Sequence, residues 1–190
     1  MTHTALKPRQ VVMLSIAAAL IAVVAVGVGS YAWATAGPRI DEEYAAGMNG
    51  STQVRGPGTV TIYAGELCLD DDGTVELLDV AVADSLHGIT VTDFGLVEPM
   101  PQAGGGTVDL GSAKKPLREA VRGRPVSRTL SYRCGDNEGF DTFLVELRKP
   151  QAGKARARGL DITYRSAGRE HTLHVDFDVT FREPRRGSAL

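Results

Sequence analysis

Two cysteines are the first candidates for chemistry in this 190-residue chain. Cys68 and Cys134 are its only cysteines. Where thiols are oxidised, two cysteines without a third leave a single intramolecular pairing. The alternative is a pair of free buried thiols in a reducing compartment, where disulfides are rare. We predict a Cys68–Cys134 disulfide, which would close a loop of about 65 residues and contribute roughly 4 kcal/mol in the chain-entropy description.

Acidic turns follow both cysteines. Their carboxylates are hard oxygen ligands of the kind that Ca²⁺ takes. A disulfide would bring the two turns together, provided that their strands run in the same direction. The spacing does not match an EF-hand loop, and Asp, Asn and Gly also make ordinary turns, in which case the chain has no cofactor. The candidate calcium ligands are Asp70, Asp72, Asp136 and Glu138.

Basic residues form another candidate site. From Pro57 to Ser112 the chain has ten acidic residues and no Lys or Arg, whereas residues 113–190 hold 17 basic and ten acidic ones. Such asymmetry can mark an interaction surface, although two halves of opposite charge can also neutralise each other within one domain. The main basic run consists of Lys114, Lys115, Arg118, Arg122, Arg124 and Arg128, with smaller groups at 148–158 and 182–186.

The partners that a basic surface outside a membrane could meet are an anionic envelope polymer, an anionic lipid surface or a protein. Nucleic acid is not expected, because no aromatic residues interleave with the basic ones to stack on bases.

The usual patterns of catalytic residues are missing from the sequence. His171 and His174 are three positions apart on a predicted strand, so they face opposite sides of a sheet. Gly104-Gly105-Gly106 lacks the Lys and Ser/Thr of a phosphate-binding loop. We therefore expect that the chain is not an enzyme, and we assign no catalytic residue. Two alternatives stay open: an extracytoplasmic hydrolase whose active site is built from loops, and an accessory subunit of another membrane protein.

An uncharged segment runs from Val11 to Trp33, and its 23 residues would span ~34 Å as a helix, against ~30 Å of bilayer hydrocarbon. Lys7 and Arg9 precede the segment and acidic residues follow it, so the positive-inside rule places the N-terminus in the cytoplasm. We predict a single-pass cell-membrane protein whose C-terminal domain is extracytoplasmic. The alternative is a cleaved signal peptide, because Ala34-Thr35-Ala36 has the form of a cleavage site, and the domain would then be secreted.

Short runs of β-branched residues, separated by turn residues, begin at Thr59. This spacing is typical of a sandwich or barrel. In the last run every second residue from Leu173 to Phe181 is apolar, which predicts a strand with one buried face and one solvent-exposed face. A bulge near Gly65 and a short helix at 115–122 are also expected. The predicted strands are 59–69, 75–83, 88–97, 126–134, 140–148, 160–166 and 171–182, with an edge strand near 106–110.

Tyr132-Arg133-Cys134 resembles the Tyr-x-Cys of immunoglobulin domains, and this resemblance implies architecture alone, because no tryptophan follows Cys68. We predict an all-β fold, an Ig-like or FnIII-like antiparallel β-sandwich of seven or eight strands preceded by one N-terminal transmembrane helix. The predicted organisation is a cytoplasmic N-terminus (1–10), a transmembrane helix (11–33), an extracytoplasmic linker (34–56), a β-sandwich domain (57–183) and a basic tail (184–190).

Overall fold

The structure is a computed structural model that describes residues 37–45, 49–53, 56–98, 115–135 and 141–182. The chain divides into two compact units, residues 1–37 and 38–190, and all described strands belong to the second. Across the described ranges, no helix has the length and apolar composition that crossing a membrane requires. The predictions for residues 1–10, 11–33 and 184–190 fall outside these ranges.

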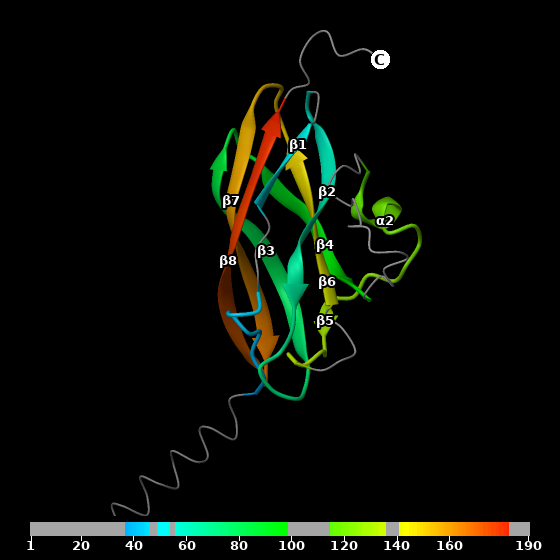
Figure 1. The fold of residues 1–190 in the computed structure, drawn as a ribbon, viewed down its shortest axis with the longest axis vertical. Helices are drawn as coiled ribbons and strands as arrows, with labels where there is room; N and C mark the ends of the chain where they lie inside the picture. Colours follow the sequence, from blue (N-terminus) through cyan, green and yellow to red (C-terminus); the bar gives the residue numbers. More distant parts are fainter. Residues whose placement is uncertain (1–36, 46–48, 54–55, 99–114, 136–140, 183–190) are drawn as a thin grey trace, which may run out of the picture. The chain divides into compact units, whose positions relative to one another are not determined.

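Eight strands among the described residues form two sheets, and neither sheet closes into a barrel (Figure 1). One sheet has the spatial order β1 (Asn49–Gln53), β8 (Arg169–Arg182), β7 (Ala155–Ser166), β3 (Val75–Leu86) and β5 (Thr129–Leu130). The other has the order β2 (Gly58–Leu67), β6 (Asp141–Lys149) and β4 (Thr90–Val97). Neighbouring strands are antiparallel except for β1, which runs parallel to β8. The prediction of an all-β domain is confirmed at this level.

One core lies between the two sheets. The alternating apolar residues of β8 point into it, as the sequence predicts, and meet apolar side chains of β2 and β6 from the facing sheet. The buried residues that carry this contact include Val175, Phe177, Val179 and Phe181 on β8, Val60 and Ile62 on β2, and Phe143 and Val145 on β6.

Register shifts interrupt four strand pairs among the described residues, and two of these shifts bear on the strands expected from the sequence. The bulge predicted near Gly65 is present, because the register of β2 against β6 shifts between Tyr63 and Gly65. Another bulge lies between β7 and β8 at Gly159, which has φ 63°: the step from Arg158 to Leu160 on β7 faces the longer step from Asp178 to Val175 on β8, so β8 carries the extra residue. This bulge lets β7 begin at Ala155 rather than at 160, since it restores the inward direction of the apolar residues on both sides.

The predicted strand 126–134 is divided between the two sheets. Ser127 exchanges hydrogen bonds of 2.8 and 2.9 Å with Leu96 of β4, in the three-stranded sheet. Two residues later, β5 pairs with β3 in the five-stranded sheet. The segment approaches β4 closely because Gly95 has no side chain: a Cβ there would lie 2.2 Å from Cγ1 of Val126.

The folded unit starts earlier than expected. Ile40, placed by the sequence analysis in the linker 34–56, is only 3% exposed and forms a bridge with Leu69. The Ser166 hydroxyl donates a 2.5 Å hydrogen bond to the carbonyl of Pro38, and β1 adds a strand beside β8. Residues 38–45 and 49–53 therefore belong to the domain. The predicted edge strand near 106–110 lies outside the described residues.

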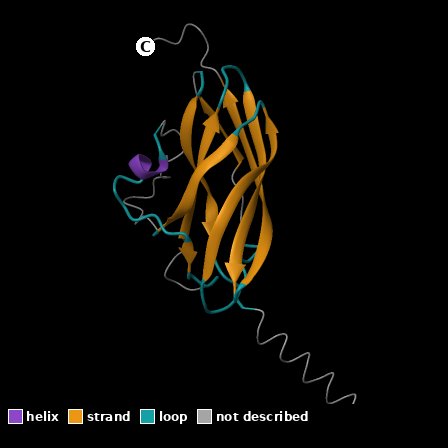
Figure 2. Ribbon diagram, turned by 180° about the vertical axis from the view of Figure 1, so that it is seen from behind, coloured by secondary structure: helices purple, strands orange, loops and turns teal. Residues whose placement is uncertain are grey.

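The short helix α2 (Leu117–Ala120) lies over the outer face of the three-stranded sheet, on one side of the domain (Figure 2). It has four residues, fewer than the predicted 115–122. Pro116 occupies the N-cap, next to the first-turn position expected for it, and the chain leaves the helix through Arg122 and Gly123, both with positive φ.

Candidate functional site

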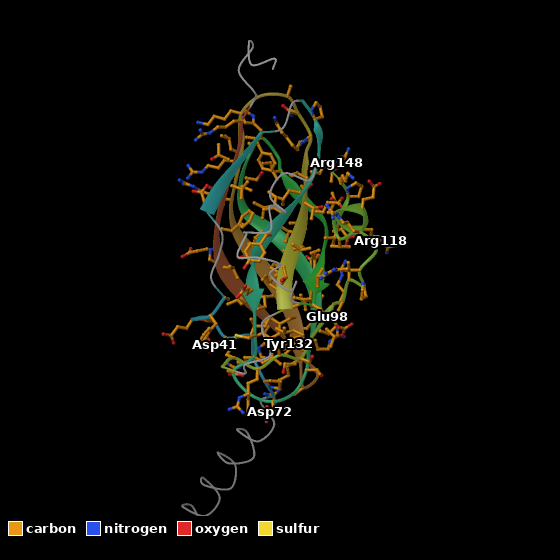
Figure 3. The ribbon with its side chains drawn as sticks, turned by 45° about the vertical axis from the view of Figure 1, so that its right-hand side comes forward. Asp41, Asp72, Glu98, Arg118, Tyr132 and Arg148 are labelled. Carbon is orange, nitrogen blue, oxygen red and sulfur yellow. A yellow bond between two sulfur atoms is a disulfide. The ribbon has the colours of Figure 1, made fainter. Side chains whose placement is uncertain are left out.

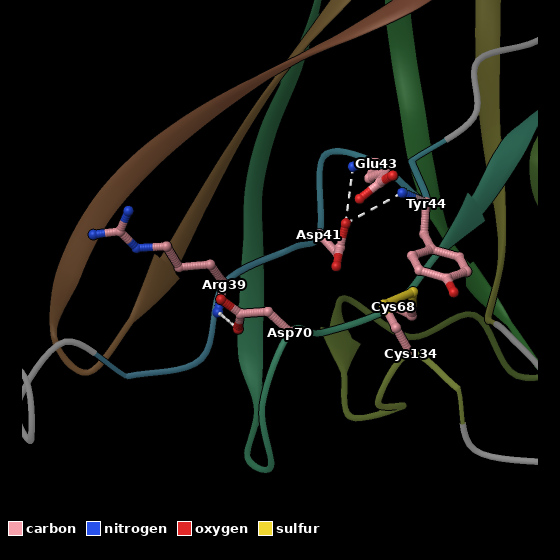
Figure 4. The surroundings of a disulfide bond; sticks show 7 residues. All are labelled: Arg39, Asp41, Glu43, Tyr44, Cys68, Asp70 and Cys134. Atoms are coloured by element: carbon pink, nitrogen blue, oxygen red, sulfur yellow. Dashed lines mark hydrogen bonds between the residues drawn. A yellow bond between two sulfur atoms is a disulfide. The ribbon is translucent and has the colours of Figure 1, made fainter.

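The disulfide prediction is confirmed, because Cys68 and Cys134 are bonded with their Cα atoms 5.0 Å apart (Figure 4). Cys68 follows β2 and is fully buried, and Cys134 follows β5. The chains beside the bridge run parallel, since Leu69 N–H donates to the Tyr132 carbonyl at 2.7 Å and Cys134 N–H donates to the Leu69 carbonyl at 2.8 Å. The two strands thus run in the same direction, which is the condition under which the two acidic turns are expected to lie close together.

The carboxylates of the first acidic turn have partners within the domain. Oδ1 of Asp70 accepts a 2.7 Å hydrogen bond from the backbone N–H of Arg39 (Figure 4). Asp72 lies 3.6 Å from the guanidinium of Arg133. Asp136 and Glu138 are outside the described residues. Within those that are described, no group of three or more His, Cys, Asp or Glu side chains could hold a metal ion, so the calcium site stays a prediction.

Residues 115–128, hereafter the basic segment, are anchored by apolar contacts to the outer face of the three-stranded sheet. Leu117 and Val121 are fully or almost fully buried there. They form a second hydrophobic cluster with Val97 and Leu144 of the sheet, separate from the main core. Burial of two side chains from so short a segment fixes its position on the sheet.

Hydrogen bonds fasten the same segment at its start. The carboxylate of Glu146 accepts a 2.7 Å hydrogen bond from Leu117 N–H through one oxygen, and a 2.7 Å hydrogen bond from the Thr92 hydroxyl through the other. The Thr61 hydroxyl donates to the carbonyl of Lys115 at 2.9 Å. Burial, with a smaller effect of the Glu66 charge, raises the pKa of the neighbouring Tyr63 phenol to about 12. Strands β2 and β6 therefore hold the start of the segment directly, and Thr92 of β4 fixes the carboxylate of Glu146.

The basic residues of this segment differ in their surroundings. Arg128 pairs with Asp93 at 2.8 Å, and its guanidinium lies 3.5 Å above the ring of Phe94. The other four described basic residues are exposed, and none has an ion-pair partner among the residues that the structure describes. These four are Lys115, Arg118, Arg122 and Arg124. Lys114 is outside the described ranges.

A hollow of about 460 Å³ lies on the outer face of the five-stranded sheet. Gly159 of β7 lines it and leaves no room for a side chain, since a Cβ there would lie 2.6 Å from the His174 ring. Beside the hollow, Nδ1 of His174 lies 2.7 Å from a carboxylate oxygen of Asp161. The lining side chains include no Ser, Thr or Cys that could act as a nucleophile with this pair.

Arginines neutralise one carboxylate of this hollow. Arg156 donates two hydrogen bonds to Asp178, and Arg158 lies 3.6 Å from the same carboxylate. The hydrogen bonds from Arg156 lower the pKa of Asp178. His171 stacks on Tyr164 with ring centroids 5.3 Å apart. It faces the side of the sheet away from the hollow, as expected from its position three residues before His174.

No protein-family model and no curated protein matches this chain. The features of the domain that bear on function are therefore its two outer faces and its disulfide.

Proposed function

We propose that the chain is a single-pass membrane protein whose β-sandwich lies outside the membrane and has a non-catalytic binding or structural role at the cell envelope. Two features support this location. Residues 11–33 are uncharged and long enough to cross a bilayer. The Cys68–Cys134 bond is of a kind that persists in oxidising compartments and is rare in the cytosol.

An Ig-like sandwich is the finer description that we propose for the domain. Two facing sheets of mainly antiparallel strands, a shared core and a disulfide support it. Two departures limit the likeness. The cysteines lie after β2 and β5 rather than within two facing strands, and β1 adds a parallel edge.

The basic segment carries the proposed binding role. Four exposed cationic side chains lie on one segment that Leu117, Val121 and Glu146 hold against the sheet. Because the segment is already fixed, little backbone entropy is lost when a partner binds. An anionic partner fits this surface by charge complementarity.

The binding role is tested by replacing the four exposed residues Lys115, Arg118, Arg122 and Arg124 by Gln in the full chain. A control with the same change in net charge replaces four exposed arginines elsewhere, namely Arg39, Arg165, Arg169 and Arg182. The first variant should leave a phosphate-bearing cation-exchange resin at clearly lower salt than the control. Elution of both at the same salt would show that net charge, not this surface, determines binding.

The location is tested by fractionating cells and labelling free thiols. We expect the chain in the membrane fraction, with both sulfurs unreactive until a reductant is added. An intact chain in the cytosolic fraction with two reactive thiols contradicts both the anchor and the compartment.

The pair of His174 and Asp161 keeps a hydrolase as a second candidate. Such a pair can act as a general base, but the lining of the hollow offers no nucleophile, so the pair would have to activate water. His174→Gln should abolish hydrolysis of a nitrophenyl ester if this candidate is correct. An undetectable rate in the unmodified protein would eliminate that activity.

A further inference from the structure

Arg148 lies on the same outer face as the basic segment, although the sequence separates it by 20 residues from Arg128. In β6 the residues Phe143, Val145 and Leu147 point into the core, so the alternate positions point outward. Arg148 is exposed at one of these outward positions, and no ion-pair partner occurs for it in the described part of the chain. In the sequence, Arg148 groups instead with the basic residues of the following loop, at 148–158.

Glu146 connects Arg148 to the basic segment. It occupies the preceding outward position of β6, about 7 Å along the strand. Its carboxylate accepts the N–H of Leu117, the first residue of α2. The strand therefore presents Arg148 beside the start of the segment, and the labelled side chains of Arg148 and Arg118 emerge on the same side of the domain in Figure 3.

This surface offers charge without exposed apolar side chains. The large hydrophobic residues exposed in the described ranges are Tyr44 and Leu86, and neither belongs to it. Proteins that bind a bilayer firmly combine basic residues with apolar side chains that enter the lipid, whereas a basic residue alone adds only a modest attraction near an anionic membrane. A surface of charge alone therefore fits an extended anionic polymer better than a bilayer, because binding to a polymer needs no apolar insertion.

We propose that Arg148 and the four basic residues Lys115, Arg118, Arg122 and Arg124 form one binding surface for an extended anionic polymer. This proposal rests on the proposed binding role and deepens it in two ways. It adds a residue from another element, and it names the partner as a polymer rather than a lipid surface. The surface is discontinuous in sequence and exists only while the segment is attached to the three-stranded sheet.

The test measures binding of the full chain to polyphosphate of defined length at several salt concentrations. A polyanion releases counterions when it binds, so the slope of log K against log salt counts the contacts. Five contacts predict a slope of about −4. Arg148→Gln and Arg118→Gln should each make the slope less steep by about one and weaken binding roughly threefold. The control is Arg169→Gln, which should change neither the slope nor the affinity. Arg169 is the exposed first residue of β8 and has no ion-pair partner in the described residues.

The outcomes separate this proposal from the binding role. If Arg118→Gln weakens binding and Arg148→Gln does not, the discontinuous surface is wrong while the basic segment keeps its role. Preferential binding to vesicles of anionic lipid over polyphosphate overturns the polymer as partner. If the unmodified protein binds neither probe, both proposals fail.

Discussion

Arg122 combines an exposed cationic side chain with a left-handed backbone, φ 53°. This conformation costs an ordinary L-residue roughly 1–2 kcal/mol, whereas Asn adopts it more readily. An arginine at this position therefore lowers stability, which is consistent with use of its side chain in binding. We expect Arg122→Asn to raise the free energy of unfolding by up to about 1 kcal/mol and to weaken binding to polyphosphate.

Urea unfolding and salt-dependent binding measure the two effects separately. Arg124→Asn is the matched control, because Arg124 has no positive φ and should lose binding without gaining stability. A lower unfolding free energy for Arg122→Asn would mean that the arginine contributes to the fold instead.

Asp178 links stability to pH. Its pKa in the folded protein is lowered below the ordinary 3.8, first by hydrogen bonds from Arg156 and then by the charges of Arg156 and Arg158. A carboxyl group with a lowered pKa adds stability above its unfolded pKa and loses that contribution as the pH falls through its folded pKa. The unmodified protein should therefore lose more stability than Asp178→Asn as the pH falls below about 4.

Melting temperatures measured in steps of pH test this expectation. Asp79→Asn serves as the control, since Asp79 is exposed on β3 of the same sheet and has no ion-pair partner in the described ranges. It should follow the unmodified protein. Parallel melting curves for the unmodified protein and Asp178→Asn would contradict a stabilising pair.

Among the elements, the contact between Gly95 of β4 and the chain at 126–127 holds the basic segment to the sheet edge. A Cβ at position 95 would lie 2.2 Å from Cγ1 of Val126 and 3.0 Å from the carbonyl oxygen of Ser127. Gly95→Ala should therefore displace this chain and lower the free energy of unfolding by roughly 1–3 kcal/mol. It should also weaken polyphosphate binding, because the end of the segment moves.

A second change distinguishes crowding from a general loss of stability. Val126→Ala removes the nearer of the two clashing groups, so Gly95→Ala with Val126→Ala should recover part of the loss that Gly95→Ala causes. The double-mutant cycle then gives a favourable interaction between the two substitutions. Simple additivity of the two losses would show that the close approach does not limit the packing.

Strands with an uninterrupted period of two could be predicted from the sequence, and strands with bulges only in part. β8 alternates from Leu173 to Phe181, and the sequence locates the start of the strand within two residues. The start of β7 was missed because Gly159 shifts the phase of the pattern. The division of 126–134 between two sheets was missed because it depends on Gly95, a residue of another strand.

The same limit applies to the candidate site. The disulfide could be predicted because two cysteines permit one pairing. The pairing of Arg128 with Asp93 and the position of Arg148 could not, because each requires knowing which strands are neighbours. One local signal for Arg148 was present, namely the alternation of Phe143, Val145 and Leu147 before it.

At the scale of the whole molecule, the Cys68–Cys134 bond joins parts of the chain that are 66 residues apart. It closes a loop that contains β3 and β4 and the whole basic segment. A loop of this length restricts the unfolded chain and contributes about 4 kcal/mol in the chain-entropy description. We expect replacement of both cysteines by Ala to lower the free energy of unfolding by about this amount.

Urea unfolding of the full chain in mild detergent measures this loss, and the unmodified protein with and without reductant gives an independent estimate. The two estimates should agree, because reduction and replacement both open the same loop. Cys68 has no exposed surface, so a reductant should cleave the disulfide slowly below the unfolding transition. Coincident unfolding curves for the oxidised, reduced and cysteine-free proteins would mean that the bond does not stabilise the domain. Thiol labelling in cells would then be the one remaining test of the oxidising compartment.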